Sequence, residues 1–116
     1  MNIQVFGTKK CFDTKKAERF FKERNIKFQF IDLKEKEMSK GEFNNVVKAV
    51  GINNIINEKA KDYKKLNFDK VRSAEVKADL LLKNQSVIKT PVVRNGKNAT
   101  VGYEPDIWNK WIEDEK

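Results

Sequence analysis

A single cysteine, Cys11, carries the only thiol in this chain of 116 residues. Lys9 and Lys10 come directly before it, and Lys15 and Lys16 follow shortly after it. The thiolate, and not the thiol, is the nucleophilic form of cysteine, and nearby positive charge lowers its pKa. These four lysines therefore indicate a thiol that is partly ionised at neutral pH and able to attack a disulfide.

The local pattern places Cys11 between a strand and a helix. Apolar and polar residues alternate over residues 2–6, which predicts a short strand. Ala17, Phe20 and Phe21 recur at the spacing of one helix face, which predicts a helix that begins close to Cys11. Unpaired backbone N–H groups at a helix start favour an anion and lower the pKa of the thiol further. One alternative stays open, because a lone cysteine is often a small, buried apolar residue.

The following residues complete a strand–helix–strand unit. Apolar residues alternate again over residues 26–31, which predicts a second strand. Two strands joined by one helix run parallel with a right-handed crossover. Residues 35–86 are then predicted to be all-helical, with Ser39 and Glu42 forming a capping box. Gly51 stands where the C-cap of that helix belongs.

The last part of the chain returns to strands. The pattern over residues 87–93 predicts a third strand. Asn95-Gly96 predicts a hairpin turn, and residues 99–101 are predicted to form a fourth strand that pairs with the third. Glu104-Pro105 begins the final helix, since proline favours the first helical position.

This order predicts an α/β protein with the thioredoxin-like topology, built on a four-stranded mixed sheet with a helical insert. We expect a core from residues 1–34 and 87–116 and an inserted helical subdomain from residues 35–86, packed as one compact unit. The hydrophobic content of 39% is sufficient for a buried core in a chain of this length.

The composition narrows the function classes. The net charge of +8 could attract nucleic acid or an acidic protein, but acidic residues are interleaved with the basic ones. With neither a helix–turn–helix nor an aromatic–basic stripe, direct nucleic-acid binding is disfavoured. No apolar run approaches the roughly 20 residues of a membrane span. A single cysteine and no histidine favour a cytoplasmic protein without a metal site.

Three motifs together resemble the ArsC/Spx family of arsenate-reductase-like proteins. Residues 5–17 resemble the family's opening strand, polar loop, cysteine and helix with a Lys-Lys-Ala run. The run Thr90-Pro91-Val92-Val93 resembles the family's Arg-Pro-Ile-Val element, which carries a cis-proline, and Val101-Gly102-Tyr103 resembles its Val-Gly-Phe/Tyr ending. Their order and spacing span almost the whole chain. The resemblance implies a thioredoxin-like fold with a helical insert and a monothiol centre at Cys11.

The sequence departs from the family pattern in two ways. Arsenate reductases of this family hold the oxyanion with three arginines, and the matching positions here are Asn57, Thr90 and Tyr103. None of these offers a permanently charged, planar fork, so efficient arsenate reduction is not expected. Many Spx proteins carry a Cys-x-x-Cys switch, whereas Thr14 stands at the second cysteine position here. A redox switch would therefore need an external thiol.

The resulting hypothesis is a thiol-dependent oxidoreductase, with Cys11 as nucleophile and Thr14 as a hydrogen-bond donor to the thiolate. The residues expected to bind the substrate or the incoming thiol are Lys9, Lys10, Thr90, Pro91 and Arg94. Glutathione or glutaredoxin would resolve the mixed disulfide, with no bound cofactor. The alternative is an Spx-like transcription regulator that binds the RNA polymerase α-subunit through the helical insert and the face near Gly51.

Overall fold

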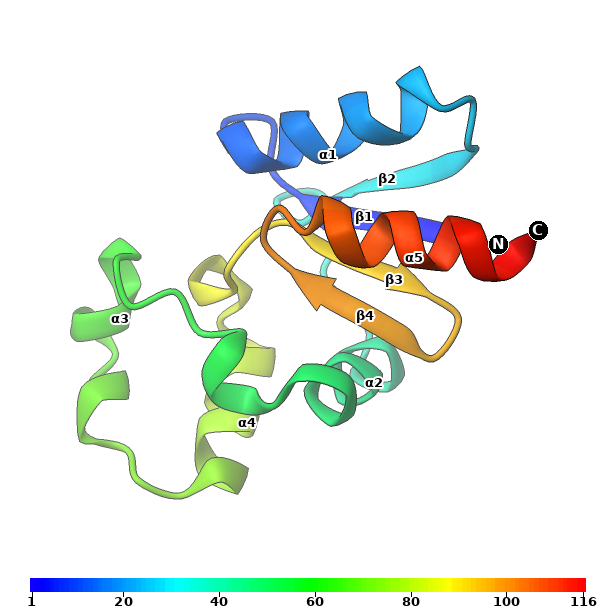
Figure 1. Ribbon diagram of the computed structural model, residues 1–116. Coiled ribbons are helices and arrows are strands. Elements are labelled where there is room, and N and C mark those ends of the chain that lie inside the picture. Colours follow the sequence, from blue (N-terminus) through cyan, green and yellow to red (C-terminus); the bar gives the residue numbers. More distant parts are fainter.

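A four-stranded mixed sheet forms the centre of the protein (Figure 1). The computed structural model describes residues 1–116. The strands are β1 (Ile3–Gly7), β2 (Phe28–Asp32), β3 (Val92–Asn95) and β4 (Asn98–Val101), in the spatial order β2-β1-β3-β4. β1 runs parallel to β2 and antiparallel to β3, and β4 runs antiparallel to β3. The predicted four-stranded mixed sheet is confirmed.

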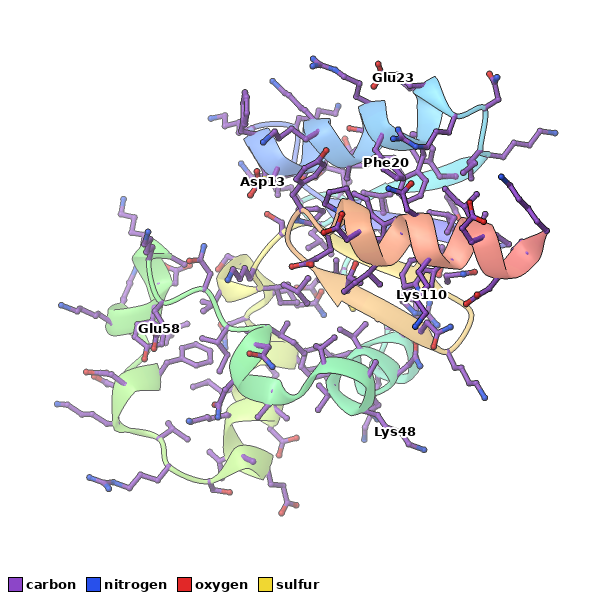
Figure 2. The ribbon with its side chains drawn as sticks, in the orientation of Figure 1. Asp13, Phe20, Glu23, Lys48, Glu58 and Lys110 are labelled. Atoms are coloured by element: carbon purple, nitrogen blue, oxygen red, sulfur yellow. The ribbon has the colours of Figure 1, made fainter.

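Two helices cover one face of the sheet, α1 (Phe12–Glu23) and α5 (Pro105–Glu115) (Figure 1). Side chains alternate between the faces of a strand, so Ile3 and Val5 point toward these helices. Figure 2 shows Phe20 in the space between the two helices. The buried cluster on this face consists of Ile3, Val5, Ala17, Phe20, Phe21, Val93, Trp108 and Trp111.

The opposite face packs against α2 (Lys40–Val50) and the helical insert. The Ser39 hydroxyl accepts from the backbone N–H of Glu42 at 3.2 Å, and the Glu42 carboxylate accepts from the backbone N–H of Ser39 at 2.9 Å. This capping box satisfies two N–H groups at the start of α2. Gly51 ends the helix with a φ of 86°, in the region that favours glycine. Both predicted helix signals are confirmed.

The rest of the insert consists of short helical pieces. They are η1 (Ile52–Asn54), α3 (Lys61–Lys65), η2 (Phe68–Lys70), α4 (Ala74–Lys83) and η3 (Gln85–Val87). The predicted all-helical segment is wrong between them, because turns and extended residues separate the pieces. Asn67, for example, lies between α3 and η2 and has a left-handed backbone conformation, with a φ of 60°. None of the helices in the protein has the length and hydropathy to cross a membrane.

The insert and the sheet share one hydrophobic cluster, in which Phe6 and Leu33 pack with Phe43 and other insert residues. Within the insert, the buried Gln85 side chain ties the segment before α2 to the segment after α4. Its amide oxygen accepts from the backbone N–H of Met38 at 2.7 Å, and its amide nitrogen donates to the Met38 carbonyl at 2.8 Å. The shared hydrophobic cluster packs the insert against the sheet, and the Gln85 hydrogen bonds hold the insert together.

Candidate functional site

Cys11 lies where the loop after β1 meets the segment before β3. Phe6 pairs with Val92 across these antiparallel strands, so both connections lie at the same end of the sheet. Cys11 is the N-cap residue of α1. Its backbone N–H donates to the Thr8 carbonyl at 3.2 Å, and its thiol donates to the Thr90 carbonyl at 3.7 Å. The two connections are thus joined through the cysteine.

The segment before β3 carries a cis peptide bond, between Thr90 and Pro91. The Cys11 side chain is partly exposed at this junction. The structure therefore brings Thr90 and Pro91 to the cysteine, although they lie far from it in the sequence. It also contradicts the alternative of a fully buried, apolar cysteine.

The surroundings of Cys11 lower the pKa of its thiol. Burial acts in the opposite direction and raises the pKa, because it disfavours the charged form. Hydrogen bonds to the thiolate outweigh burial, and they come from the Thr14 and Thr90 side chains and from the backbone N–H groups of Thr14 and Asp13. Donors at the start of α1 and the Thr90 side chain, rather than the charges of the nearby lysines, account for this lowering of the pKa.

Thr14 is the buried partner of the cysteine. Its side chain is fully buried, and its hydroxyl has no hydrogen-bond partner when the Cys11 thiol donates to Thr90. A buried hydroxyl without a partner destabilises the fold. The same hydroxyl lies close enough to the Cys11 sulfur to lower the pKa of the thiol as a hydrogen-bond donor. The polar groups here are therefore better satisfied by the thiolate than by the thiol.

Gly7 at the end of β1 makes room for Thr14. A Cβ atom on Gly7 would lie 2.5 Å from Cγ2 and 3.0 Å from Cβ of Thr14, closer than van der Waals contact. Only glycine therefore lets α1 approach the end of β1 this closely. The sequence places Gly7 in a polar loop, and nothing local reveals its contact with Thr14.

An exposed aromatic cluster lies beside Cys11. The Lys16 ammonium is 5.5 Å from the centroid of the Phe12 ring and 4.7 Å from that of the Tyr103 ring. Phe12 is 72% exposed and Tyr103 is 38% exposed. Tyr103 packs edge-on against the buried Trp108, whose indole N–H donates to the Thr100 hydroxyl at 2.8 Å. Sequence reasoning missed this cluster, and its only local signal is the i, i+4 spacing of Phe12 and Lys16.

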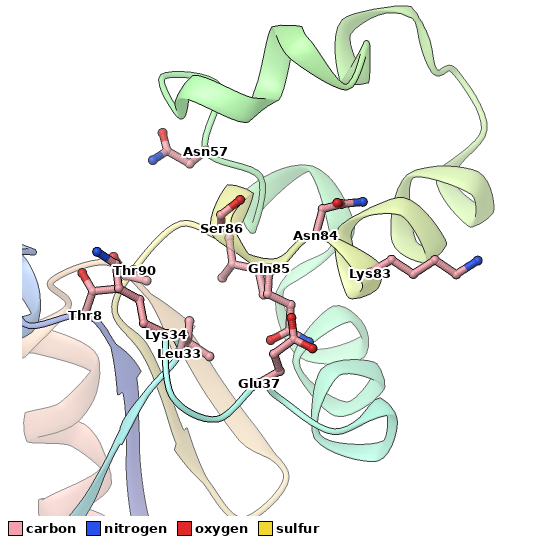
Figure 3. A pocket seen from close by; sticks show the side chains of 11 residues that line it. Thr8, Leu33, Lys34, Glu37, Asn57, Lys83, Asn84, Gln85, Ser86 and Thr90 are labelled. Atoms are coloured by element: carbon pink, nitrogen blue, oxygen red, sulfur yellow. The ribbon is translucent and has the colours of Figure 1, made fainter.

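A cavity of about 530 Å³ lies between the Cys11 loops and the insert (Figure 3). It begins at Thr8 and Thr90, whose carbonyl groups accept hydrogen bonds from Cys11, and it extends toward Glu37 and Lys83. Its lining residues are Thr8, Leu33, Lys34, Glu37, Asn57, Lys83, Asn84, Gln85, Ser86, Ile88 and Thr90. The lining is mostly polar and contains two ammonium groups.

The expected basic residues divide into two groups. Lys9 and Lys10 are exposed in the turn before Cys11, and neither forms an ion pair. Arg94, in contrast, is held away from the cysteine. Its guanidinium donates to the side-chain oxygens of Gln4 at 2.6 Å and Asn45 at 2.9 Å.

A third partner of Arg94 is the Glu42 carboxylate, at 3.6 Å from the guanidinium. Arg94 stands opposite Gln4 in the sheet, so it points toward α2 from further along β3. The structure therefore does not bring Arg94 to the site, and its role there is corrected to that of a link between the sheet and α2.

Comparison with known proteins identifies the family. The pattern of the ArsC family matches residues 6–111. The protein belongs to the ArsC family. It is 23% identical over 107 residues to the global transcriptional regulator Spx of Streptococcus pyogenes, in a match that covers 90% of this chain and 80% of the regulator.

Solved structures of ArsC-like proteins share the fold. The YffB protein is 27% identical, with a TM-score of 0.82 over 94% of this chain and 97% of the other. An ArsC family related protein from Bacteroides fragilis is 22% identical, with a TM-score of 0.84 over 95% of this chain and 97% of the other. The predicted thioredoxin-like architecture with an insert is thus confirmed as that of ArsC-like proteins.

The three positions that the sequence led us to expect opposite the arginines of ArsC arsenate reductases do not form one pocket. Asn57 and Thr90 line the cavity beside Cys11. Tyr103 lies outside that cavity, against Lys16. None of the three is an arginine, and Arg94 is hydrogen-bonded to Gln4 and Asn45 away from the site. The cavity therefore presents the hydroxyl of Thr90 and the amide of Asn57 to a substrate, and no guanidinium group.

Proposed function

We propose that this ArsC-family protein is a thiol-dependent oxidoreductase in which Cys11 exchanges with disulfides. The observation that supports this most is the Cys11 sulfur itself, which is partly exposed and has a lowered pKa. The buried Thr14 hydroxyl adds to the argument, because it gains a partner when the sulfur is ionised. An accessible thiolate is the nucleophile that this chemistry needs.

The proposed reaction consists of two exchange steps. In the first, the Cys11 thiolate attacks one sulfur of the substrate disulfide, a Cys11 mixed disulfide forms, and the other substrate sulfur leaves as a thiolate. In the second, an external thiolate attacks the substrate-derived sulfur of the mixed disulfide and releases Cys11 as a thiolate. Because Cys11 is the only cysteine, the external thiol is proposed to be glutathione, either directly or through glutaredoxin.

The cavity beside Thr8 and Thr90 is the proposed position of the glutathionyl group. Its volume of about 530 Å³ lies within the range of small-molecule sites. The ammonium groups of Lys34 and Lys83 offer charge to the two carboxylates of glutathione. Arsenate is disfavoured as a substrate, since the positions of its expected arginine ligands hold uncharged residues.

Two measurements together test this function. The rate of alkylation by iodoacetamide, followed against pH, is expected to have a midpoint below about 8.5, the value of a free cysteine. A short S-glutathionylated peptide is expected to be reduced in the presence of glutathione, and Cys11→Ser should abolish this activity. A midpoint at or above the free-cysteine value, with no reduction of the peptide, would refute the proposal.

A second candidate is a transcription regulator, favoured by the similarity to Spx over most of the chain. In this case the proposed partner is the RNA polymerase α-subunit, bound through the insert and the face near Gly51. The immobilised protein should then retain the isolated C-terminal domain of that polymerase chain at low salt. Absence of retention would eliminate this candidate.

A further inference from the structure

The surface around the Cys11 sulfur is open. Cys11 does not line the cavity of about 530 Å³, although Thr8 and Thr90 beside it do. The adjoining Phe12 ring is 72% exposed. A substrate that is small on both sides of its disulfide would be expected in an enclosed site. An open thiol beside an exposed aromatic ring instead fits a disulfide that another protein carries on its surface.

A groove between α1 and α5 extends this surface away from the cysteine. It has a volume of about 360 Å³, and its lining residues are Lys16, Arg19, Phe20, Glu23, Arg24, Tyr103 and Pro105. The groove begins at Lys16 and Tyr103, which belong to the aromatic cluster beside Cys11. Three cationic side chains line it against one carboxylate, that of Glu23, which Figure 2 shows on the outer side of α1.

The positive charges on this surface have no carboxylate partner within the chain. The ion pairs of the protein join the N-terminus to Glu115, Arg94 to Glu42, and Lys116 to Glu113. The unpaired cations around Cys11 and along the exposed side of α1 are Lys9, Lys10, Lys15, Lys16 and Arg19, and they outnumber the unpaired carboxylates of α1, which are those of Asp13, Glu18 and Glu23. The resulting excess of positive charge attracts a partner of opposite charge and accelerates its encounter.

We propose that the substrates of Cys11 are mixed disulfides between glutathione and acidic proteins. The acidic segment that carries the disulfide lies across Phe12 and continues past Lys16 and Tyr103 into the groove between α1 and α5. This inference rests on the proposed disulfide exchange, and it adds which class of molecule carries the disulfide and where that molecule docks.

The reaction balances with free glutathione as its one co-reactant. The Cys11 thiolate attacks the glutathione sulfur, the substrate S–S bond breaks, and the acidic protein leaves as a thiolate that takes a proton from water. A second glutathione then attacks the glutathione sulfur bound to Cys11, which gives glutathione disulfide and the free Cys11 thiolate. The protein cysteine is reduced and one free glutathione is oxidised, because the other half of the glutathione disulfide comes from the substrate.

The test uses three short peptides that differ only in the charge around one S-glutathionylated cysteine, which is flanked by glutamates, glutamines or lysines. Hydroxyethyl disulfide serves as a small, uncharged substrate. At low salt, the second-order rate constant for the glutamate peptide is expected to exceed that for the lysine peptide by roughly tenfold or more. The ratio should fall toward one near 1 M salt, where the screening length is only about 3 Å.

Charge-reversal variants separate local from overall charge. Lys16→Glu with Arg19→Glu should reduce the glutamate-to-lysine rate ratio to below about a third of its wild-type value. Lys64→Glu with Lys65→Glu makes the same change in net charge on the exposed face of α3 and should retain most of the ratio. The ratio is the decisive quantity, because any change in the reactivity of the sulfur affects both peptides equally.

The outcomes distinguish this inference from the function on which it rests. Reduction of hydroxyethyl disulfide with equal rates for the three peptides would overturn the acidic partner and leave the exchange chemistry standing. If the chain reduces no substrate at all, the proposed function fails. An equal loss of the ratio in both charge-reversal variants would also overturn the docking site. Tighter binding of duplex DNA than of the glutamate peptide by Cys11→Ser would identify nucleic acid as the ligand instead.

Discussion

Replacing Thr14 with valine is expected to stabilise the protein and to slow its chemistry. Valine keeps the branched shape of threonine and puts a methyl group in the place of the hydroxyl. That hydroxyl is fully buried and has no partner while Cys11 is a neutral thiol. An unpaired buried hydroxyl costs about 1–3 kcal/mol, so Thr14→Val should raise the free energy of unfolding by about 1 kcal/mol. In a domain of this size, that gain corresponds to roughly 4 °C in Tm.

The sign of this effect depends on pH, because the folded protein lowers the pKa of Cys11. A group whose pKa is lowered on folding stabilises the protein fully above its unfolded-state pKa, about 8.5 for cysteine. That contribution is lost as the pH falls through the folded-state pKa. Since Thr14→Val removes one donor to the thiolate, the variant should be more stable than wild type at acidic pH. Above about pH 8.5 the variant should be no more stable than wild type, or less stable.

The same substitution should weaken the nucleophile. A hydrogen bond to a charged group contributes about 1.5–3 kcal/mol, and about 1.4 kcal/mol is a factor of ten in an ionisation equilibrium. Near pH 7, where alkylation depends on the thiolate fraction, Thr14→Val should therefore react with iodoacetamide roughly tenfold more slowly. Thr14→Ser, which keeps a hydroxyl, should retain most of the rate.

Urea unfolding at about pH 5.5 and about pH 9.5, together with alkylation at pH 7, provides the assay. If Thr14→Val proves less stable than wild type at the acidic pH and alkylates at the wild-type rate, the hydroxyl does not act on the thiolate. The reasoning about the site would then be wrong, while the fold would stand.

Two further substitutions test the placement of residues around the site. Gly7→Ala forces a Cβ against Thr14 and should lower the free energy of unfolding by about 1–3 kcal/mol, measured as a lower urea midpoint; an unchanged midpoint would show that β1 and α1 are not this close. Arg94→Met removes the bonds to Gln4 and Asn45 and should cost about 1–2 kcal/mol of stability. The alkylation rate of Cys11 in this variant should stay within about twofold of wild type. A much larger loss would show that Arg94 does act on the cysteine.

The elements that carry Cys11 could be predicted because their signals are local. The alternation over residues 2–6 and the helical spacing of Ala17, Phe20 and Phe21 each lie within one element. The sequence therefore predicts correctly that the cysteine stands before a helix. The backbone N–H groups at the helix start and the Thr14 hydroxyl are predicted correctly as causes of the lowered pKa, whereas the four lysines are not among its causes. The full burial of Thr14 could not be predicted, because it depends on how closely α1 packs against Gly7 at the end of β1.

The misplacement of Arg94 has a geometric cause. Arg94 follows Pro91 closely in the sequence, but an extended strand rises about 3.3 Å per residue. Three residues therefore move the side chain about 10 Å along β3, away from the end where Cys11 lies. The cluster of Lys16 with Tyr103 was missed for the converse reason. Its members are far apart in the sequence and meet only because α1 and α5 cover the same face.

The distribution of charge around Cys11 favours a disulfide over an oxyanion as the substrate. An oxyanion brings its own charge to the site, so its binding needs fixed cations in contact with it. A disulfide is neutral, and the charge in the exchange resides on sulfur, where hydrogen-bond donors are sufficient. In this chain the donors to the sulfur are hydroxyl and backbone N–H groups, and the expected arginine positions hold Asn57, Thr90 and Tyr103. Lys16 and Arg19 lie further along the exposed side of α1, where they can select the protein that carries the disulfide.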